Sequence, residues 1–70
     1  MNTLRIRSVL IHIAHALPYA VQISHDNLIW WTVNRYKTQE EAVSTGMALE
    51  QFMRDNQSIQ PVAVFWKGRV

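Results

Sequence analysis

The 70-residue chain contains no cysteine, so a disulfide bond and a thiolate metal site are both excluded. Its two glycines, Gly46 and Gly68, are too far apart to form a glycine-rich loop around a phosphate. No apolar run reaches the roughly 20 residues that a membrane-spanning helix needs. So small a chain also leaves little room for a pocket with a supporting shell. These absences predict a protein that is not an enzyme and holds no metal or cofactor.

Hydrophobic residues make up 49% of the chain, which is typical of a folded protein rather than a disordered one. Residues 1–70 are therefore expected to form one small domain. A domain of this size buries only about 60% of the surface that its unfolded chain exposes, so its stability is expected to be marginal. Small folds without disulfides often gain stability by oligomerising, and we expect a homodimer.

Residues 8–17 are largely apolar and follow two arginines, so they superficially resemble a signal peptide. His12 and His15 interrupt this run, and the small-residue cleavage pattern is missing after it. We therefore expect a cytoplasmic protein with no membrane association. The same histidines have a metal-like spacing, but in a strand they would point to opposite faces, and two histidines do not complete a zinc site.

Two strands and a hairpin are predicted in the N-terminal half. Leu4–Ala14 is rich in β-branched residues and alternates weakly, although a helix is an open alternative there. Tyr19–Ser24 alternates cleanly between apolar and polar residues, which is typical of a sheet with one polar face. His25, Asp26 and Asn27 are expected to form a three-residue hairpin loop, with Asn27 in the left-handed conformation.

The hairpin decides where the adjacent residues Trp30 and Trp31 lie, because successive side chains of a strand point to opposite faces. A three-residue loop places Trp31 opposite Val21, in the core. Trp30 then lies on the other face with Gln22, Leu28 and Thr32. We expect replacement of Trp31 by alanine to cost about 3–5 kcal/mol. Replacement of Trp30 should spare the fold but weaken association.

Thr38 and Glu41 form a capping-box pattern, which predicts a helix over residues 39–55. The inner stripe of this helix is expected to consist of Ala42, Gly46, Leu49 and Met53. Gly46 costs about 1 kcal/mol relative to alanine inside a helix, which suggests a packing reason for it. A large ring, with Trp31 as the favoured candidate, is expected to lie against the gap at Gly46.

Pro61 prevents the helix from continuing, and Val62–Trp66 is predicted to be a final strand. Because this strand is apolar on both faces, it is expected to be central in the sheet or buried at an interface. The elements predict an α+β fold with a three- to four-stranded, mainly antiparallel sheet. One amphipathic helix, between the third and fourth strands, is expected to cover one face.

The net charge is only +2, but the charges are unevenly distributed. Those between Thr38 and Gln57 sum to −3, whereas the rest of the chain carries +5. The helix is thus expected to be acidic, and the sheet with its termini basic. Such asymmetry either attracts an anionic partner to one side or serves only solubility.

Two kinds of partner suit these residues. Leu10, Leu28 and Trp30 are expected to form an apolar patch on the outer side of the sheet, which favours a protein partner. Alternatively, Trp30 and Tyr36 lie on one side of their strand and provide a stacking platform for nucleic acid. The full set of candidate partner-binding residues is Trp30, Leu28, Leu10, Tyr36, Arg5, Arg7, Lys37, Lys67 and Arg69.

The stretch from Trp31 to Leu49 combines an aromatic strand, a Thr-capped helix start and small residues within the helix. In this it resembles small uncharacterised bacterial and phage domains built as strand hairpin, helix and strand. Standalone proteins of this style resemble phage inhibitors of host defence, such as anti-CRISPR proteins. The resemblance implies a non-enzymatic protein that blocks a nucleic-acid-handling complex sterically, and it transfers no catalytic residue.

Overall fold

The computed structural model describes residues 4–56 and 60–69. Its elements follow in the order β1 (Arg5–Leu10), β2 (Tyr19–Ser24), β3 (Trp31–Tyr36), α1 (Gln39–Asn56) and β4 (Val62–Arg69). The strands form one mixed sheet in the order β3-β2-β1-β4, with β1 and β4 parallel and the other neighbours antiparallel. The predicted α+β class and element order are confirmed.

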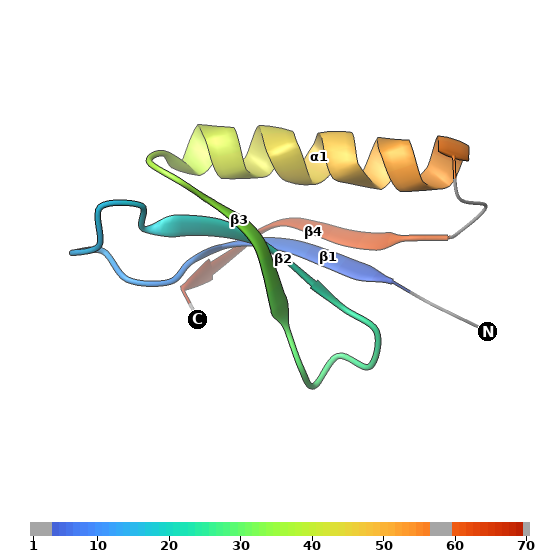
Figure 1. The fold of residues 1–70 in the computed structure, drawn as a ribbon, viewed down its shortest axis with the longest axis horizontal. Helices are drawn as coiled ribbons and strands as arrows, with labels where there is room; N and C mark the ends of the chain where they lie inside the picture. The colour runs from blue at the N-terminus through green and yellow to red at the C-terminus, as the bar shows by residue number, and fades with distance from the viewer. Residues whose placement is uncertain (1–3, 57–59, 70) are drawn as a thin grey trace.

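The helix α1 lies across one face of the sheet (Figure 1). We call this covered side the inner face and the opposite side the outer face. The connection through α1 is long enough to carry the chain across the sheet and to set β4 beside β1 in parallel. In residues 4–56 and 60–69, no helix is both long and apolar enough to cross a membrane.

The core lies between the inner face and α1. Its buried centre consists of Ile6 from β1, Val21 from β2 and Ala42 from α1. Burial of an Ile or Val side chain contributes about 1.5–3 kcal/mol each, so these few residues carry much of the stability. Partly buried side chains pack around them: Tyr19, Ile23, Tyr36, Leu49, Met53 and Ala63. The predicted inner stripe of the helix is confirmed.

Gly46 faces Ser8 of β1, not the ring of Trp31. The Ser8 hydroxyl donates a 2.8 Å hydrogen bond to the carbonyl oxygen of Ala42. A Cβ atom built on Gly46 would lie 2.8 Å from Ser8 Oγ, well inside van der Waals contact. The glycine therefore allows the helix to approach β1 closely enough for this hydrogen bond.

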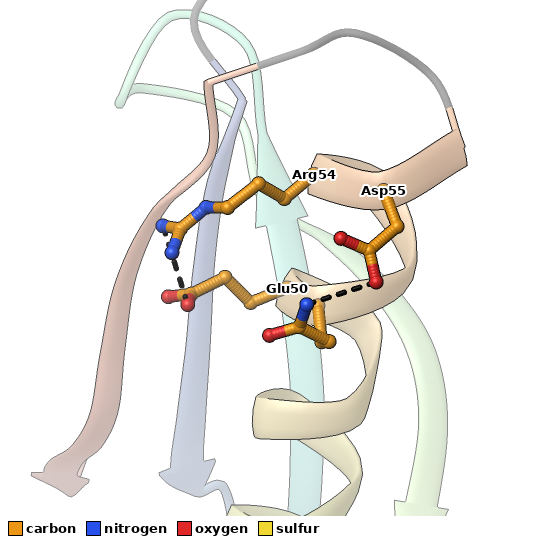
Figure 2. Close-up of polar contacts among 4 residues, drawn as sticks. Glu50, Arg54 and Asp55 are labelled. Carbon is orange, nitrogen blue, oxygen red and sulfur yellow. Dashed lines mark hydrogen bonds and ion pairs between the residues drawn. The ribbon is translucent and has the colours of Figure 1, made fainter.

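The first turn of α1 has the capping hydrogen bond that its sequence predicts, and an ion pair lies on its surface near the last turn. Glu41 N–H donates to Thr38 Oγ1 at 3.2 Å, and the Thr38 hydroxyl donates to the Glu41 carboxylate. Figure 2 shows the last turns, where Arg54 forms an ion pair with Glu50 four residues earlier. Such exposed pairs contribute about 0.3–0.5 kcal/mol.

The hairpin prediction is partly wrong. Asn27 adopts the expected left-handed conformation, with φ of 64°. However, β3 begins only at Trp31, which pairs with Ile23 rather than Val21. Asp26 stabilises this longer connection, because its carboxylate accepts from the backbone N–H groups of Leu28 and Ile29 at 2.9 and 3.0 Å.

Trp31 is not a core residue, because it is 62% exposed. In Figure 1, β3 starts far from α1 and approaches the helix only at its C-terminal end. Trp31, the first residue of β3, therefore lies away from α1, and its expected place in the core is wrong. The physical reason is the position of β3 at the sheet edge.

Two other strand predictions need correction. The first strand ends at Leu10, and neither a strand nor a helix continues to Ala14. A turn follows, in which His15 N–H donates to the His12 carbonyl oxygen. The last strand extends to Arg69 and lies at an edge of the sheet, not in its centre.

Candidate binding site on the outer face of the sheet

A hollow of about 450 Å³ opens on the outer face, over β1 and β4. We call it the basic groove. Its lining contains three cationic side chains and one indole, and no carboxylate. The lining residues are Arg5, Ile6, Arg7, Asn27, Trp30, Val62, Val64 and Lys67.

The parallel pairing of β1 with β4 builds the floor of the groove. Arg5 lies opposite Val62, and Arg7 lies opposite Val64. Because side chains alternate along a strand, these four residues share one face while Ile6 points into the core. The floor thus combines half-exposed valines with arginines.

An irregularity in β4 adds the third cation. From Arg7 to Val9, β1 advances two residues, while β4 advances from Val64 to Gly68. The extra residues of β4 include Lys67, which reaches the groove lining. Gly68 ends this stretch with φ of 95°, a conformation that side chains rarely adopt. Such bulges re-aim side chains and are common beside functional sites.

Arg7 is the least exposed of the three cations of the groove, with only 8% of its surface exposed. Its Nε donates to Gln22 Oε1 at 2.9 Å, and the Gln22 amide donates to Thr32 Oγ1 at 3.2 Å. This relay crosses β1, β2 and β3 on the outer face. Burial lowers the pKa of Arg7, because desolvation disfavours its charged form.

Trp30 covers the Arg7 guanidinium, whose central carbon lies 3.9 Å from the ring centroid. A cation over an indole face is an attractive arrangement, and it is stronger where water is excluded. The loop that carries Trp30 is held by hydrogen bonds from the backbone N–H groups of Ile29 and Leu28 to the Asp26 carboxylate, and these bonds lower its pKa. Trp30 therefore lies on the outer face, as predicted.

Four of the nine candidate residues come together in the basic groove: Arg5, Arg7, Trp30 and Lys67. Lys37 and Arg69 do not line it. Lys37 lies in the connection between β3 and α1, and Arg69 pairs with Leu10 at the far end of β4. The predicted separation of charge is present in part, with the acidic helix on the inner face and three cations on the outer.

The predicted apolar patch does not form. Leu10 alternates with Ile6 and Ser8, which face the helix, so it is not on the outer face. Leu28 is 82% exposed in the hairpin connection and does not line the groove. Trp30 alone of the three expected residues belongs to the groove.

The expected pairing of Trp30 with Tyr36 on one side of the strand is wrong. Val21 pairs with Asn34 but Gln22 pairs with Thr32, so Val33 is an extra residue in β3. This bulge shifts the alternation by one position. Tyr36 therefore packs against the core, while Trp30 lies over Arg7 on the outer face.

Sequence reasoning missed several residues of the groove. The sequence also gives no sign that Gln22, which lies beside the groove on the outer face, holds Arg7 by a hydrogen bond. Val62 and Val64 could have been identified from the sequence. They are alternate residues of a predicted strand that is apolar on both faces, so one apolar pair had to lie on the outer face. Asn27 was assigned only a turn role, although it also lines the groove.

The three histidines lie in the connections between strands, within the described ranges 4–56 and 60–69. No cluster of three or more histidine or acidic residues there has the geometry to hold a metal ion. The Nδ1 atoms of His12 and His15 instead accept backbone N–H groups two residues further on. The chain matches no family model, no curated protein and no solved structure.

Proposed function

We propose that this protein is a non-enzymatic binding protein that holds single-stranded nucleic acid in the basic groove. The observation that carries the proposal is the lining of the groove: Arg5, Arg7 and Lys67 lie beside Trp30 with no carboxylate among them. Proteins that bind single strands without reading sequence combine a cationic groove with aromatic side chains. The valine floor adds apolar surface for sugars and bases.

The test is a titration of fluorescent single-stranded DNA and RNA with the full chain, followed by anisotropy. If three phosphates are neutralised, affinity should fall about 20-fold between 50 and 200 mM salt, from a slope of about −0.7 per contact. The Lys67→Gln variant should bind more weakly and show a slope smaller by about one contact.

Arg69→Gln provides the matched control, because it removes the same charge from the same strand outside the groove. It should change affinity much less than Lys67→Gln. Equal losses in the two variants would indicate a general charge effect rather than a site. Absence of binding, or binding that does not respond to salt, would contradict the proposal.

A second candidate function has its own observation. The β3 edge and the connection before it expose apolar side chains, and residues 27–34 contain no charge. The large ones are Leu28, Ile29, Trp31 and Val33. An uncharged, apolar edge strand is a surface for pairing with another chain. A second copy of this protein, or a host defence complex that it blocks in the anti-CRISPR manner, would suit this edge.

Val33→Lys tests the second candidate, because a charge on an edge strand opposes strand pairing. A homodimer through this edge should become monomeric in light scattering, and capture of a protein partner from nuclease-treated bacterial lysate should be lost. Capture that resists high salt in the unmodified protein supports this function, since an apolar interface depends little on salt. A monomeric protein that captures nothing contradicts it.

A further inference from the structure

The Arg7 guanidinium is nearly buried and yet has no ion-pair partner in the described part of the chain. The sequence has five carboxylate side chains, all in the described residues, and none of them forms an ion pair with Arg7. Glu50 pairs with Arg54, and Asp26 accepts backbone N–H groups of its own loop. Buried charges in proteins are normally paired, because removal from water is costly. The pairing group for Arg7 is therefore expected to come from a ligand.

The geometry leaves a defined part of Arg7 for that ligand. Its Nε is occupied by Gln22, and Trp30 lies over the guanidinium. Its two terminal nitrogens form no hydrogen bond with residues 4–56 and 60–69. Arg7 lines the basic groove, and these two nitrogens are the donors of its guanidinium that Gln22 leaves unused. Two parallel N–H groups suit an anion with two oxygens in a plane.

The surroundings favour a phosphodiester over other anions. Arg5 and Lys67 supply further positive charge in the same groove, which suits a chain of phosphates more than a single carboxylate. Trp30, Val62 and Val64 add apolar and aromatic surface within the same lining. A nucleotide offers both a phosphate and a planar base, whereas phosphoserine and phosphothreonine offer only the phosphate.

We propose that Arg7 is a preformed subsite for one phosphodiester group of a nucleic-acid strand, held in place by Gln22 and Trp30 before the strand binds. The inference rests on the proposed function, because it assigns one position of the same groove. It makes Arg7 different in kind from Arg5 and Lys67. Arg7 contacts one phosphate through its fork of two N–H groups, while the other two act mainly through charge.

Lysine substitutions test the fork. Arg7→Lys keeps the charge but loses the paired donors, and it should weaken binding of a single-stranded oligonucleotide about tenfold, the loss typical of a strong charge-assisted contact. Arg5→Lys is the matched control and should weaken binding less than about threefold. The amide NMR spectrum of each variant verifies that it is folded. A folded Arg7→Lys variant that binds like the unmodified protein overturns the inference.

A measurement on the unmodified protein keeps the inference testable if Arg7→Lys does not fold. Dithymidine monophosphate, which has one phosphodiester, should shift the side-chain NMR signals of Arg7. The methylphosphonate analogue, which lacks the charge, should leave them in place. Equal shifts with both compounds, or none with either, overturn the inference.

The outcomes separate the inference from the proposed function. Salt-dependent oligonucleotide binding that is unchanged in Arg7→Lys leaves the proposed function standing and removes the subsite. A response of Arg7 to inorganic phosphate alone, or to a phosphopeptide but not to the dinucleotide, overturns the inference, and absence of oligonucleotide binding overturns both. Loss of oligonucleotide binding in Arg7→Lys, with Arg7 signals that follow the charged dinucleotide, supports both.

Discussion

The contact between Gly46 and Ser8 makes a quantitative prediction about how the helix is seated on the sheet. A methyl group added by Gly46→Ala would lie 2.8 Å from Ser8 Oγ. Forcing such a contact in a packed core costs about 1–3 kcal/mol. Alanine regains about 1 kcal/mol of helix propensity. The net loss in the free energy of unfolding is therefore about 0–2 kcal/mol.

Removal of the Ser8 hydroxyl should reverse the sign of this effect. Ser8→Ala alone loses one hydrogen bond to Ala42, which is worth about 1 kcal/mol. Among the described residues, Ser8 Oγ is the one atom within 4 Å of the added methyl group, apart from the chain neighbours of Gly46 and the nearby backbone of the helix. In the Ser8→Ala background, Gly46→Ala should therefore stabilise the domain by up to about 1 kcal/mol.

Urea unfolding of the four proteins in this double-mutant cycle provides the measurement. The predicted coupling between the two sites is about 1–3 kcal/mol, well above the few tenths expected for independent sites. If Gly46→Ala changed stability equally in both backgrounds, Ser8 would not be the group that requires the glycine. The close approach of α1 to β1 would then not be explained by the absence of a side chain at Gly46.

Two further predictions concern the hairpin between β2 and β3. Trp31→Ala should change the free energy of unfolding in urea by only about 0.5 kcal/mol, because the side chain is largely exposed. Trp30→Ala should cost more, about 2 kcal/mol, through loss of the contact with Arg7, which reverses the order expected from the sequence. A larger loss for Trp31→Ala than for Trp30→Ala would place Trp31 in the core. Asp26 has a folded-state pKa below its ordinary value of 3.8. Its ionised carboxylate therefore stabilises the folded domain at pH values above 3.8, and this contribution should disappear as the pH falls through the lowered pKa. Acid unfolding followed by Trp fluorescence should show this loss, and Asp26→Asn, which keeps an acceptor oxygen, should be less sensitive to pH over the same range.

Local patterns predicted the elements that depend on neighbours in sequence. The capping residues at Thr38 and Glu41 located the start of α1, and the spacing of its apolar residues identified the face that packs on the sheet. The alternation in Tyr19–Ser24 gave β2 with its bounds. These signals depend on backbone geometry within one element, so a single sequence carries them.

The features that failed depend on contacts between strands. The bulge at Val33 moves Tyr36 to the inner face of the sheet, and the residue types around Val33 do not predict a bulge. The longer connection around Asp26 shifts Trp31 out of the core. In the same way, the sequence identifies Arg7 only as one of several candidate cations, because its burial and its partner Gln22 arise only when β1 and β2 pair.

The most direct test of a nucleic-acid site on the outer face is a titration of the isotopically labelled protein with a short single-stranded oligonucleotide. The largest NMR shifts are predicted at Arg5, Arg7 and Lys67, together with the indole N–H of Trp30 and the methyl groups of Val62 and Val64. Signals of the helix surface, including Glu50 and Arg54, should remain in place. Shifts confined to α1 or to the β3 edge, or no shifts at oligonucleotide concentrations up to the millimolar range, would contradict the account.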